Sequence, residues 1–163
     1  MKILVVSDSH GDTASFESAV KKHRSADVIV FCGDGHRDLA AIRNLHRDKA
    51  YAAVAGNCDW YCDLPLVQEL ELCSKKIIVT HGHNFGVKDG YSRITAFGHS
   101  NNADILLFGH THKQFCTVDG KMLILNPGSI GYRGNYSIIE IDERTGKTKA
   151  TEYPDSDFGP III

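Results

Sequence analysis

The amino-acid sequence predicts an α/β fold in which two packed β-sheets are flanked by helices. The first half alternates short apolar runs with helical stretches in the order β-α-β-α-β, which is typical of parallel strands joined by crossover helices. The second half is mostly short strands, with turn signals at Asp119-Gly120 and Thr145-Gly146 that favour antiparallel hairpins. A chain that combines parallel strands in one half with antiparallel hairpins in the other fits two packed sheets better than one doubly wound sheet.

Five elements are expected in the first half of the chain. Lys2–Val6 is mostly apolar and suits a strand that is buried on both faces. Thr13–His23 carries apolar side chains at helical spacing. The next strand, helix and strand are expected at Val28–Cys32, Asp38–Leu45 and Tyr51–Ala55.

The pattern of apolar and polar residues changes after Pro65, where the second half of the chain begins. Leu66–Leu72 alternates apolar and polar residues, as a half-exposed strand does, and Lys76–Thr80 is its expected neighbour. A helix over Asp89–Gly98 and a buried strand at Asp104–Phe108 follow. Three short strands are then expected, at Phe115–Val118, Met122–Leu125 and Ser137–Ile141.

Length, charge and cysteine content narrow the class of protein. The 163 residues contain no linker or repeat and fit a single domain over 1–163, with a C-terminal tail at 155–163. The apolar end of this tail is expected to dock on its own sheet or in a homodimer contact, because exposed apolar runs are usually covered. The formal charge of −2 gives no general attraction to nucleic acid or to anionic membranes.

We expect a cytoplasmic protein with reduced cysteines. The N-terminal apolar run is too short for a signal peptide, and no apolar stretch has the length of a membrane span. The five cysteines are odd in number and lack CxxC spacing, which argues against a disulfide framework and a structural zinc site. Cys32, Cys73 and Cys116 lie in strand-like runs and are expected to act as small core residues.

Potential metal ligands follow five successive predicted strands. The motifs are Asp8-Ser9-His10, Gly33-Asp34, Gly56-Asn57-Cys58-Asp59, His81-Gly82-His83 and Gly109-His110-Thr111-His112. Because the carboxyl ends of strands in α/β sheets converge on one crevice, these side chains are expected to meet. Asp, Asn and neutral His supply the oxygen and nitrogen ligands that Mn, Fe, Ni and Zn accept. Each motif alone also fits an ordinary turn or helix cap, so the prediction depends on all five together.

In this order the five motifs resemble those of the calcineurin-like metallophosphoesterase superfamily. Asn126-Pro127-Gly128-Ser129 is similar to a turn of the small, single-domain phosphodiesterase branch, which includes the retromer subunit of eukaryotes as a diverged relative. The resemblance runs from Lys2 to about Ile141 and implies a four-layer α-β-β-α sandwich of two mixed sheets flanked by helices. It further implies two divalent metal ions, with Mn2+ as our first expectation and Fe, Ni or Zn as alternatives.

The resemblance also implies a ligand set for each ion. Metal one would be held by Asp8, His10, Asp34 and His112, and metal two by Asp34, Asn57, His81 and His110. Asp34 would bridge the two ions, and neutral Asn57 would limit the negative charge of the site. The implied reaction is hydrolysis of a phosphate ester, with a small phosphodiester as the expected substrate, by in-line attack of a metal-bridging hydroxide.

Cys58 stands where many members of this superfamily have a histidine that contacts the phosphoryl group. A thiol with a reference pKa of about 8.5 carries no positive charge and is a weak proton donor. We therefore expect the rate to depend on the stability of the leaving group, with His83 either a substitute acid or an ordinary loop histidine. Trp60, just past Asn57, either lines the substrate pocket or packs beneath it.

Two other functions are compatible with the same motifs, and further histidines lie outside them. A non-catalytic interaction scaffold on the same fold and a phosphomonoesterase stay open as alternatives. A scaffold is free to lose ligands, whereas all seven ligand positions are filled here, which favours catalysis. Nucleic acid is not expected as a substrate, because the charge is balanced and the sequence has no basic or aromatic-rich stripe. His23, His36 and His46 lie on helical segments and are expected at the surface.

Overall fold

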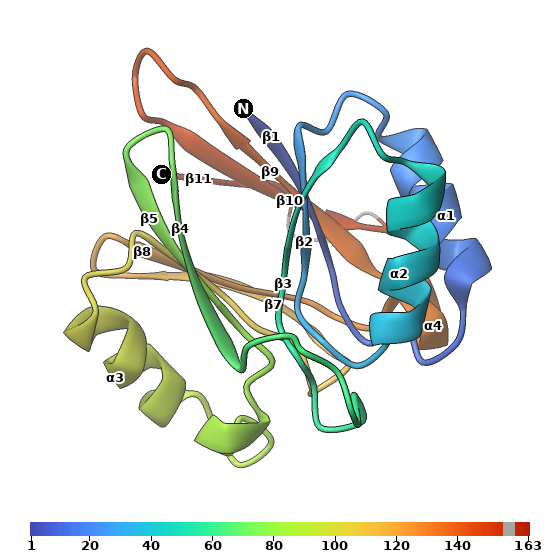
Figure 1. The fold of residues 1–163 in the computed structure, drawn as a ribbon. Coiled ribbons are helices and arrows are strands. Elements are labelled where there is room, and N and C mark those ends of the chain that lie inside the picture. The colour runs from blue at the N-terminus through green and yellow to red at the C-terminus, as the bar shows by residue number, and fades with distance from the viewer. Residues whose placement is uncertain (155–158) are drawn as a thin grey trace.

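The computed structural model describes residues 1–154 and 159–163, which form two mixed β-sheets packed face to face (Figure 1). The first sheet has the strand order β11 (Ile161–Ile162), β10 (Thr148–Tyr153), β9 (Tyr136–Ile141), β1 (Lys2–Val6), β2 (Val28–Phe31) and β3 (Ala50–Ala53). The second has the order β4 (Val67–Leu72), β5 (Lys75–Thr80), β6 (Ile105–Leu107), β8 (Met122–Pro127) and β7 (Gln114–Asp119). In the first sheet β1, β2 and the edge strand β3 are parallel, whereas β9, β10 and β11 pair antiparallel. In the second sheet β5, β6 and β8 are parallel, whereas the edge strands β4 and β7 pair antiparallel.

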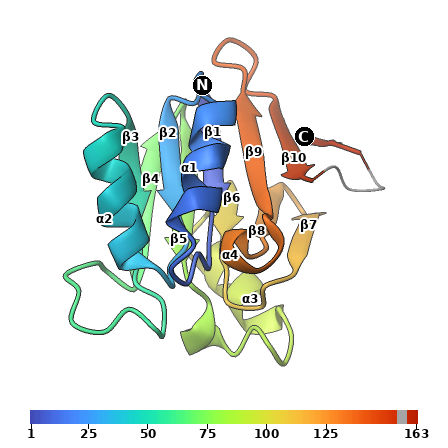
Figure 2. The same cartoon turned by 90° about the vertical axis from the view of Figure 1, so that its right-hand side faces the viewer.

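Helices cover the outer face of each sheet, so the predicted four-layer sandwich is confirmed (Figures 1 and 2). On the first sheet lie α1 (Thr13–Lys22), α2 (His36–Leu45) and the short α4 (Ile130–Arg133). On the second lie α3 (Ser92–Ser100) and the 3-10 turn η1 (His83–Phe85). None of the described helices is long and apolar enough to cross a membrane.

Strand β1 illustrates how the layers are held together. Ile3 and Val5 face the second sheet, whereas Leu4 and Val6 face the helices, because successive side chains of a strand point to opposite faces. All four side chains have no exposed surface. Burying each such side chain contributes about 1.5–3 kcal/mol, so the strand ends that carry the polar motifs are anchored firmly.

The predicted elements are present, with shifted ends. Helix α3 begins at Ser92 rather than Asp89, because Gly90 has a φ of 142°, which a right-handed helix cannot contain. Cys73 lies in the turn between β4 and β5 rather than in a strand. Cys73 and Ser74 have φ values of 51° and 57°, as the two central residues of a type I′ hairpin turn require.

The sequence analysis missed β10, and the reason is its composition. Thr148–Tyr153 contains little apolar surface and pairs with β9 through the backbone. The predicted docking of the C-terminal end on its own sheet is confirmed for β11, which pairs with β10 through Ala150 and Ile161. Residues 155–158 of the predicted tail lie outside the described residues.

The surface prediction for His23 is wrong. His23 ends α1 and is only 8% exposed, with its Nε2 3.1 Å from the hydroxyl of Tyr136. Its ring also packs edge-on against Tyr153 of β10. His36 and His46 are half-buried rather than exposed. Helical spacing alone could not reveal these contacts, because β9 and β10 follow α1 by more than a hundred residues.

Candidate metal centre

The polar motifs meet because five parallel strand ends of both sheets point to the same edge of the sandwich. Asp8, Asp34 and Asn57 follow β1, β2 and β3 of the first sheet, and His81 and His110 follow β5 and β6 of the second. Backbone hydrogen bonds join the loops within each sheet, such as Asp8 N–H to Gly33 O at 2.9 Å. The site therefore draws on both layers of the sandwich.

One group of candidate ligands consists of Asp8, His10 and His112. Their ligand atoms all lie within 4.8 Å of one another. Asp8 Oδ1 is 3.1 Å from His112 Nε2 and 3.8 Å from His10 Nε2, and the two imidazole nitrogens are 3.2 Å apart. This is the set that the sequence analysis gave to metal one, apart from the shared Asp34.

A second group consists of Asp34, His81 and His110, again with ligand atoms within 4.8 Å. His81 Nε2 is 3.3 Å from Asp34 Oδ2 and 3.2 Å from Asn57 Oδ1. The same Asp34 oxygen is 3.8 Å from His10 Nε2 of the first group. Asp34 Oδ2 thus stands between the two groups, where a shared carboxylate must stand.

The hydrogen bonding of these residues fits divalent cations. Asp8 Oδ1 is buried and lies 3.1 Å from His112 Nε2, and the hydrogen bond to Asp8 raises the pKa of His112. Asp8 Oδ2 accepts from Ser7 Oγ at 2.5 Å and from His110 N–H at 3.1 Å. A buried carboxylate oxygen needs a positive partner, which a bound dication or a protonated His112 can supply. His81 Nδ1 lies 2.7 Å from the Cys32 carbonyl and donates to it, so Nε2 faces the centre and carries the lone pair when the imidazole is neutral.

Neighbouring charges set the protonation of the second group. Burial acts to raise the pKa of the Asp34 carboxyl, but the hydrogen bond and charge of His81 outweigh it and bring the pKa below its usual range. For His81, burial acts to lower the pKa, but Asp34 and Asp8 together raise it. Burial, with the nearby His81, lowers the pKa of His110 to about 4, so this imidazole is neutral near pH 7, as a metal ligand must be.

The backbone of the site adopts a conformation that residues other than glycine seldom adopt. Nine non-glycine residues among those described have positive φ, and five of them are candidate ligands: Asp8, His10, Asp34, His110 and His112. Such conformations cost of order 1–3 kcal/mol each and persist where the surrounding structure imposes them. The strain is concentrated at the residues that would bind metal.

Asp59 fixes the loops that carry Asp34 and Asn57. Its carboxylate accepts the backbone N–H groups of Asp34, Gly35, His36 and Gly56, each at 2.8 Å. Sequence reasoning quoted Asp59 as part of a motif but gave it no role. The available signal was its position two residues after Asn57.

Asp38 fixes the loop that carries His10. From the first turn of α2 it accepts Ser9 Oγ at 2.6 Å, Gly11 N–H at 2.8 Å and Thr13 Oγ1 at 2.6 Å. Sequence reasoning missed this residue, because an Asp near the start of a helix is ordinarily explained by its favourable interaction with the helix dipole.

Cys58 and His83 both lie beside the candidate ligands. The Cys58 N–H donates to Asp34 Oδ1 at 2.7 Å, and its thiol, with a pKa raised by burial and by Asp34, is protonated near neutral pH. The His83 ring centroid is 5.4 Å from that of His81 and 6.1 Å from that of His110. Burial lowers the pKa of His83, so this imidazole is mostly neutral at pH 7.

Comparison with known proteins gives the family. Residues 1–144 match the family described as the Calcineurin-like phosphoesterase superfamily domain. The chain belongs to the calcineurin-like phosphoesterase superfamily. The predicted resemblance is therefore confirmed.

Two named relatives of this calcineurin-like phosphoesterase and one solved structure of the same fold illustrate the similarity. The probable metallophosphoesterase YsnB of Bacillus subtilis is 35% identical over 132 residues, covering 80% of this chain and 75% of YsnB. Phosphodiesterase YfcE of Escherichia coli is 27% identical, covering 87% and 89% of the two chains. The crystal structure of a Vps29 single mutant from Entamoeba histolytica has a TM-score of 0.78 at 23% identity and covers 100% of this chain and 97% of its own.

Proposed function

We propose that this calcineurin-like phosphoesterase is a phosphodiesterase that uses two divalent metal ions. The observation that carries the proposal is the position of Asp34 Oδ2, 3.3 Å from His81 Nε2 of its own group of candidate ligands and 3.8 Å from His10 Nε2 of the neighbouring group. Asp8, His10, Asp34 and His112 would hold one ion, and Asp34, Asn57, His81 and His110 the other. Manganese is the first candidate, because the mixed oxygen and nitrogen ligands suit it, although Fe, Ni and Zn accept the same set.

Bound dications would supply a hydroxide near neutral pH and would offset the charge of the phosphate. The residues of the chain position these reactants. Neutral Asn57 and neutral His110 keep the number of anionic ligands low, so the loaded site attracts an anionic ester. Cys58 lies beside the ligands as a protonated thiol and contributes no positive charge.

A phosphodiester is the substrate class that the surroundings favour. A diester carries one negative charge and a monoester carries nearly two at neutral pH, and a thiol at position 58 offers the second charge no cation. The relative YfcE is named a phosphodiesterase. A direct comparison of bis(p-nitrophenyl) phosphate with p-nitrophenyl phosphate separates this proposal from the phosphomonoesterase alternative.

The second candidate function is a protein-interaction scaffold, which the fold similarity to Vps29 favours. The two candidates differ in whether loss of the ligands matters. A scaffold would keep its function without metal, whereas a phosphodiesterase would lose its activity. The cytoplasmic location and a homodimer remain predictions under either function.

The decisive experiment combines metal analysis with hydrolysis of bis(p-nitrophenyl) phosphate by the purified protein under each metal. Asp34→Asn and His81→Ala should each lower bound metal and reduce kcat/KM by at least about 100-fold, since changes to supporting residues alone cost 10–100-fold. His99→Ala is the matched control, because this exposed histidine pairs with Asp119 outside the site. Full activity of Asp34→Asn, or no hydrolysis by any metal-loaded form of the wild type, would contradict the proposal.

A further inference from the structure

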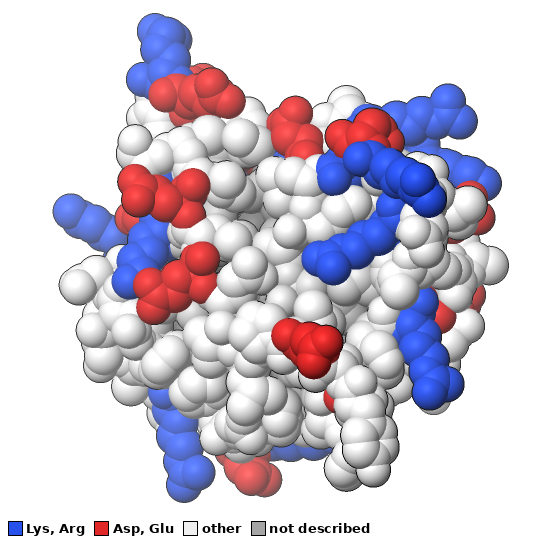
Figure 3. Space-filling model, in the orientation of Figure 1, with Lys and Arg blue, Asp and Glu red and all other residues white. Residues whose placement is uncertain are grey.

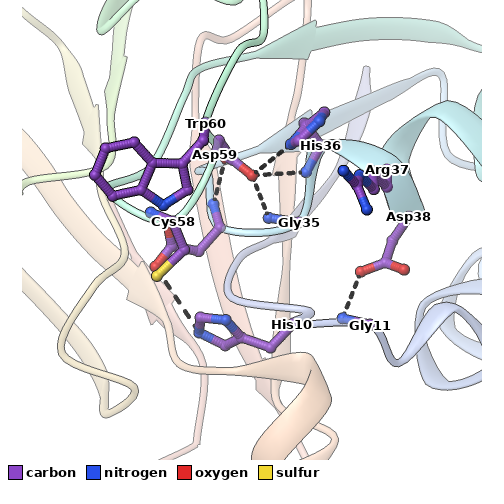
Figure 4. A pocket seen from close by; sticks show the side chains of 10 residues that line it. His10, Gly11, Gly35, His36, Arg37, Asp38, Cys58, Asp59 and Trp60 are labelled. Carbon is purple, nitrogen blue, oxygen red and sulfur yellow. Dashed lines mark hydrogen bonds and ion pairs between the residues drawn. The ribbon is translucent and has the colours of Figure 1, made fainter.

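A cavity of about 330 Å³ opens directly beside the candidate metal ligands (Figure 4). His10, Asp34 and Cys58 line the part of the cavity that belongs to the candidate metal centre. The first turn of α2, with Arg37, and the loop that ends in Trp60 line the rest, and Figure 4 shows these two side chains on opposite sides. The volume is at the lower end of the range for small-molecule sites and suits one ring-sized group.

The carboxylates of Asp59 and Asp38, which line the cavity wall, already accept hydrogen bonds from the surrounding loops. Asp59 accepts four backbone N–H groups and the His36 ring, and Asp38 accepts two hydroxyls and one backbone N–H. The acidic residues therefore serve the loops and offer an incoming ligand few free acceptors. The side chains left to contact a ligand are those of Arg37 and Trp60.

Arg37 and Trp60 are unusually free for residues beside a candidate active site. Arg37 is exposed and forms no ion pair or hydrogen bond with any residue that the structure describes. The Trp60 side chain is 72% exposed, although burial of an indole is strongly favourable. An indole face stacks on planar rings, and a guanidinium donates to the oxygens at the edge of such a ring.

We propose that this cavity binds a planar aromatic substituent of the phosphodiester, stacked on Trp60 with its oxygen-bearing edge toward Arg37. The inference rests on the proposed function, because it places the phosphate of the same substrate at the candidate metal centre. An aliphatic substituent fits less well, since it would desolvate Arg37 without offering an acceptor in return. Aryl esters and nucleoside esters share the planar ring, and the experiment separates them.

Binding can be followed directly, because Trp60 is the single tryptophan of the chain. The Mn2+-loaded protein would be titrated with methyl 4-carbamoylphenyl phosphate, whose ring carries a carbonyl oxygen at its far edge, with the methyl ester of thymidine 5′-phosphate and with dimethyl phosphate, while tryptophan fluorescence is recorded. The two ring-bearing esters should change the fluorescence saturably, and dimethyl phosphate should not. The ester that saturates at the lower concentration identifies the source of the ring. An equal response to dimethyl phosphate, or no response to either ring, would overturn the inference.

Kinetics provide a second, independent measurement. Stacking on an aromatic side chain contributes about 1–3 kcal/mol, so Trp60→Ala should raise KM for bis(p-nitrophenyl) phosphate roughly 5- to 150-fold. Trp60→Phe should restore most of the affinity, because it keeps an aromatic face. Inhibition by dimethyl phosphate should be the same in all variants, which reports an intact metal site.

Matched controls separate this inference from the proposed function. Tyr61 is the fully exposed neighbour of Trp60 and does not line the cavity, so Tyr61→Ala should behave as the wild type. Arg43 lies on the same helix as Arg37 and packs on Tyr51, so Arg43→Ala should match the wild type while Arg37→Ala raises KM. If the wild type hydrolyses the diester and Trp60→Ala has the KM of Tyr61→Ala, this inference fails alone. If the wild type hydrolyses nothing, the proposed function fails first.

Discussion

The carboxylate of Asp59 illustrates how a residue without a metal-facing atom can control the candidate ligands. It holds Gly56 and Asp34, the residues at the ends of two neighbouring strands, through hydrogen bonds of 2.8 Å. Burial acts to raise the pKa of Asp59, but the backbone donors outweigh it and keep the group ionised. Asp59 therefore acts on a candidate ligand such as Asn57 by fixing the position of the loop that carries it.

Replacing Asp59 by Asn should therefore weaken metal binding without removing a ligand. An amide oxygen accepts fewer of the four N–H groups and carries no charge, so we expect metal affinity to fall about 10- to 100-fold. Isothermal titration with Mn2+ would measure the change. Asp104→Asn is the control, because Asp104 accepts the Lys76 N–H far from the site. Unchanged affinity in Asp59→Asn would contradict the positioning role.

Cys58 leads to a prediction about the leaving group. With a protonated thiol beside the ligands and no strong acid assigned, the rates of the wild type with aryl methyl phosphates should fall steeply as the pKa of the leaving phenol rises. Cys58→His should flatten this dependence, because an imidazolium is a stronger general acid. Cys62→His, four residues further along the same loop, should keep the steep slope. A flat dependence in the wild type would indicate an acid already in place, for which His83 is the candidate.

At the scale of the elements, α1 carries a buried titratable group where it packs on the first sheet. His23, at the end of the helix, lies against Tyr136 of β9 and Tyr153 of β10. Burial lowers the pKa of His23, and the nearby Lys2 lowers it further. The neutral imidazole is therefore the form that the packed helix accepts.

The packing of α1 should make stability depend on pH. Because the folded-state pKa of His23 is below the unfolded value of about 6.5, the unfolded chain binds the proton more readily. The free energy of unfolding should fall as pH drops below 6.5 and should stop responding to this group below its folded-state pKa. Urea unfolding at several pH values would show a smaller drop for His23→Gln than for the wild type. His99→Gln, at an exposed site on α3, should retain the wild-type drop.

At the scale of the whole molecule, the candidate ligands come from both sheets of the sandwich. The first and second sheets supply different halves of the candidate ligand set, so bound metal would join the two layers. On the face in Figure 3, Lys and Arg lie in separate groups interleaved with Asp and Glu. That face provides no continuous basic stripe for a polyanion.

Metal binding should consequently stabilise the fold. At a metal concentration 100 times Kd, the gain is about 2.7 kcal/mol, which corresponds to an increase in Tm of roughly 5–10 °C for a domain of this size. Thermal unfolding with EDTA and with added Mn2+ would measure the shift. Asp34→Asn should show little or no increase, and an equal increase in that variant would place the stabilising ions elsewhere.

The sequence by itself determined the family, the two-sheet fold class and the identity of the candidate ligands. Buried strands and hairpin turns are encoded locally, and each ligand motif directly follows a strand, so both could be recognised from neighbouring residues. The element ends were less certain, as Gly90 and the polar β10 illustrate, because a backbone turn or an edge pairing leaves little trace in an apolar pattern.

Only the tertiary structure decided how these pieces act together. The place of Asp34 between two histidine groups, the support from Asp59 and Asp38, the burial of His23 and the cavity between Arg37 and Trp60 all join segments far apart in the chain. Such contacts depend on how layers pack and which loops meet, which no local pattern specifies. The amino-acid sequence thus determines which functional side chains the protein has, and the packing of the two sheets decides which of them come into contact.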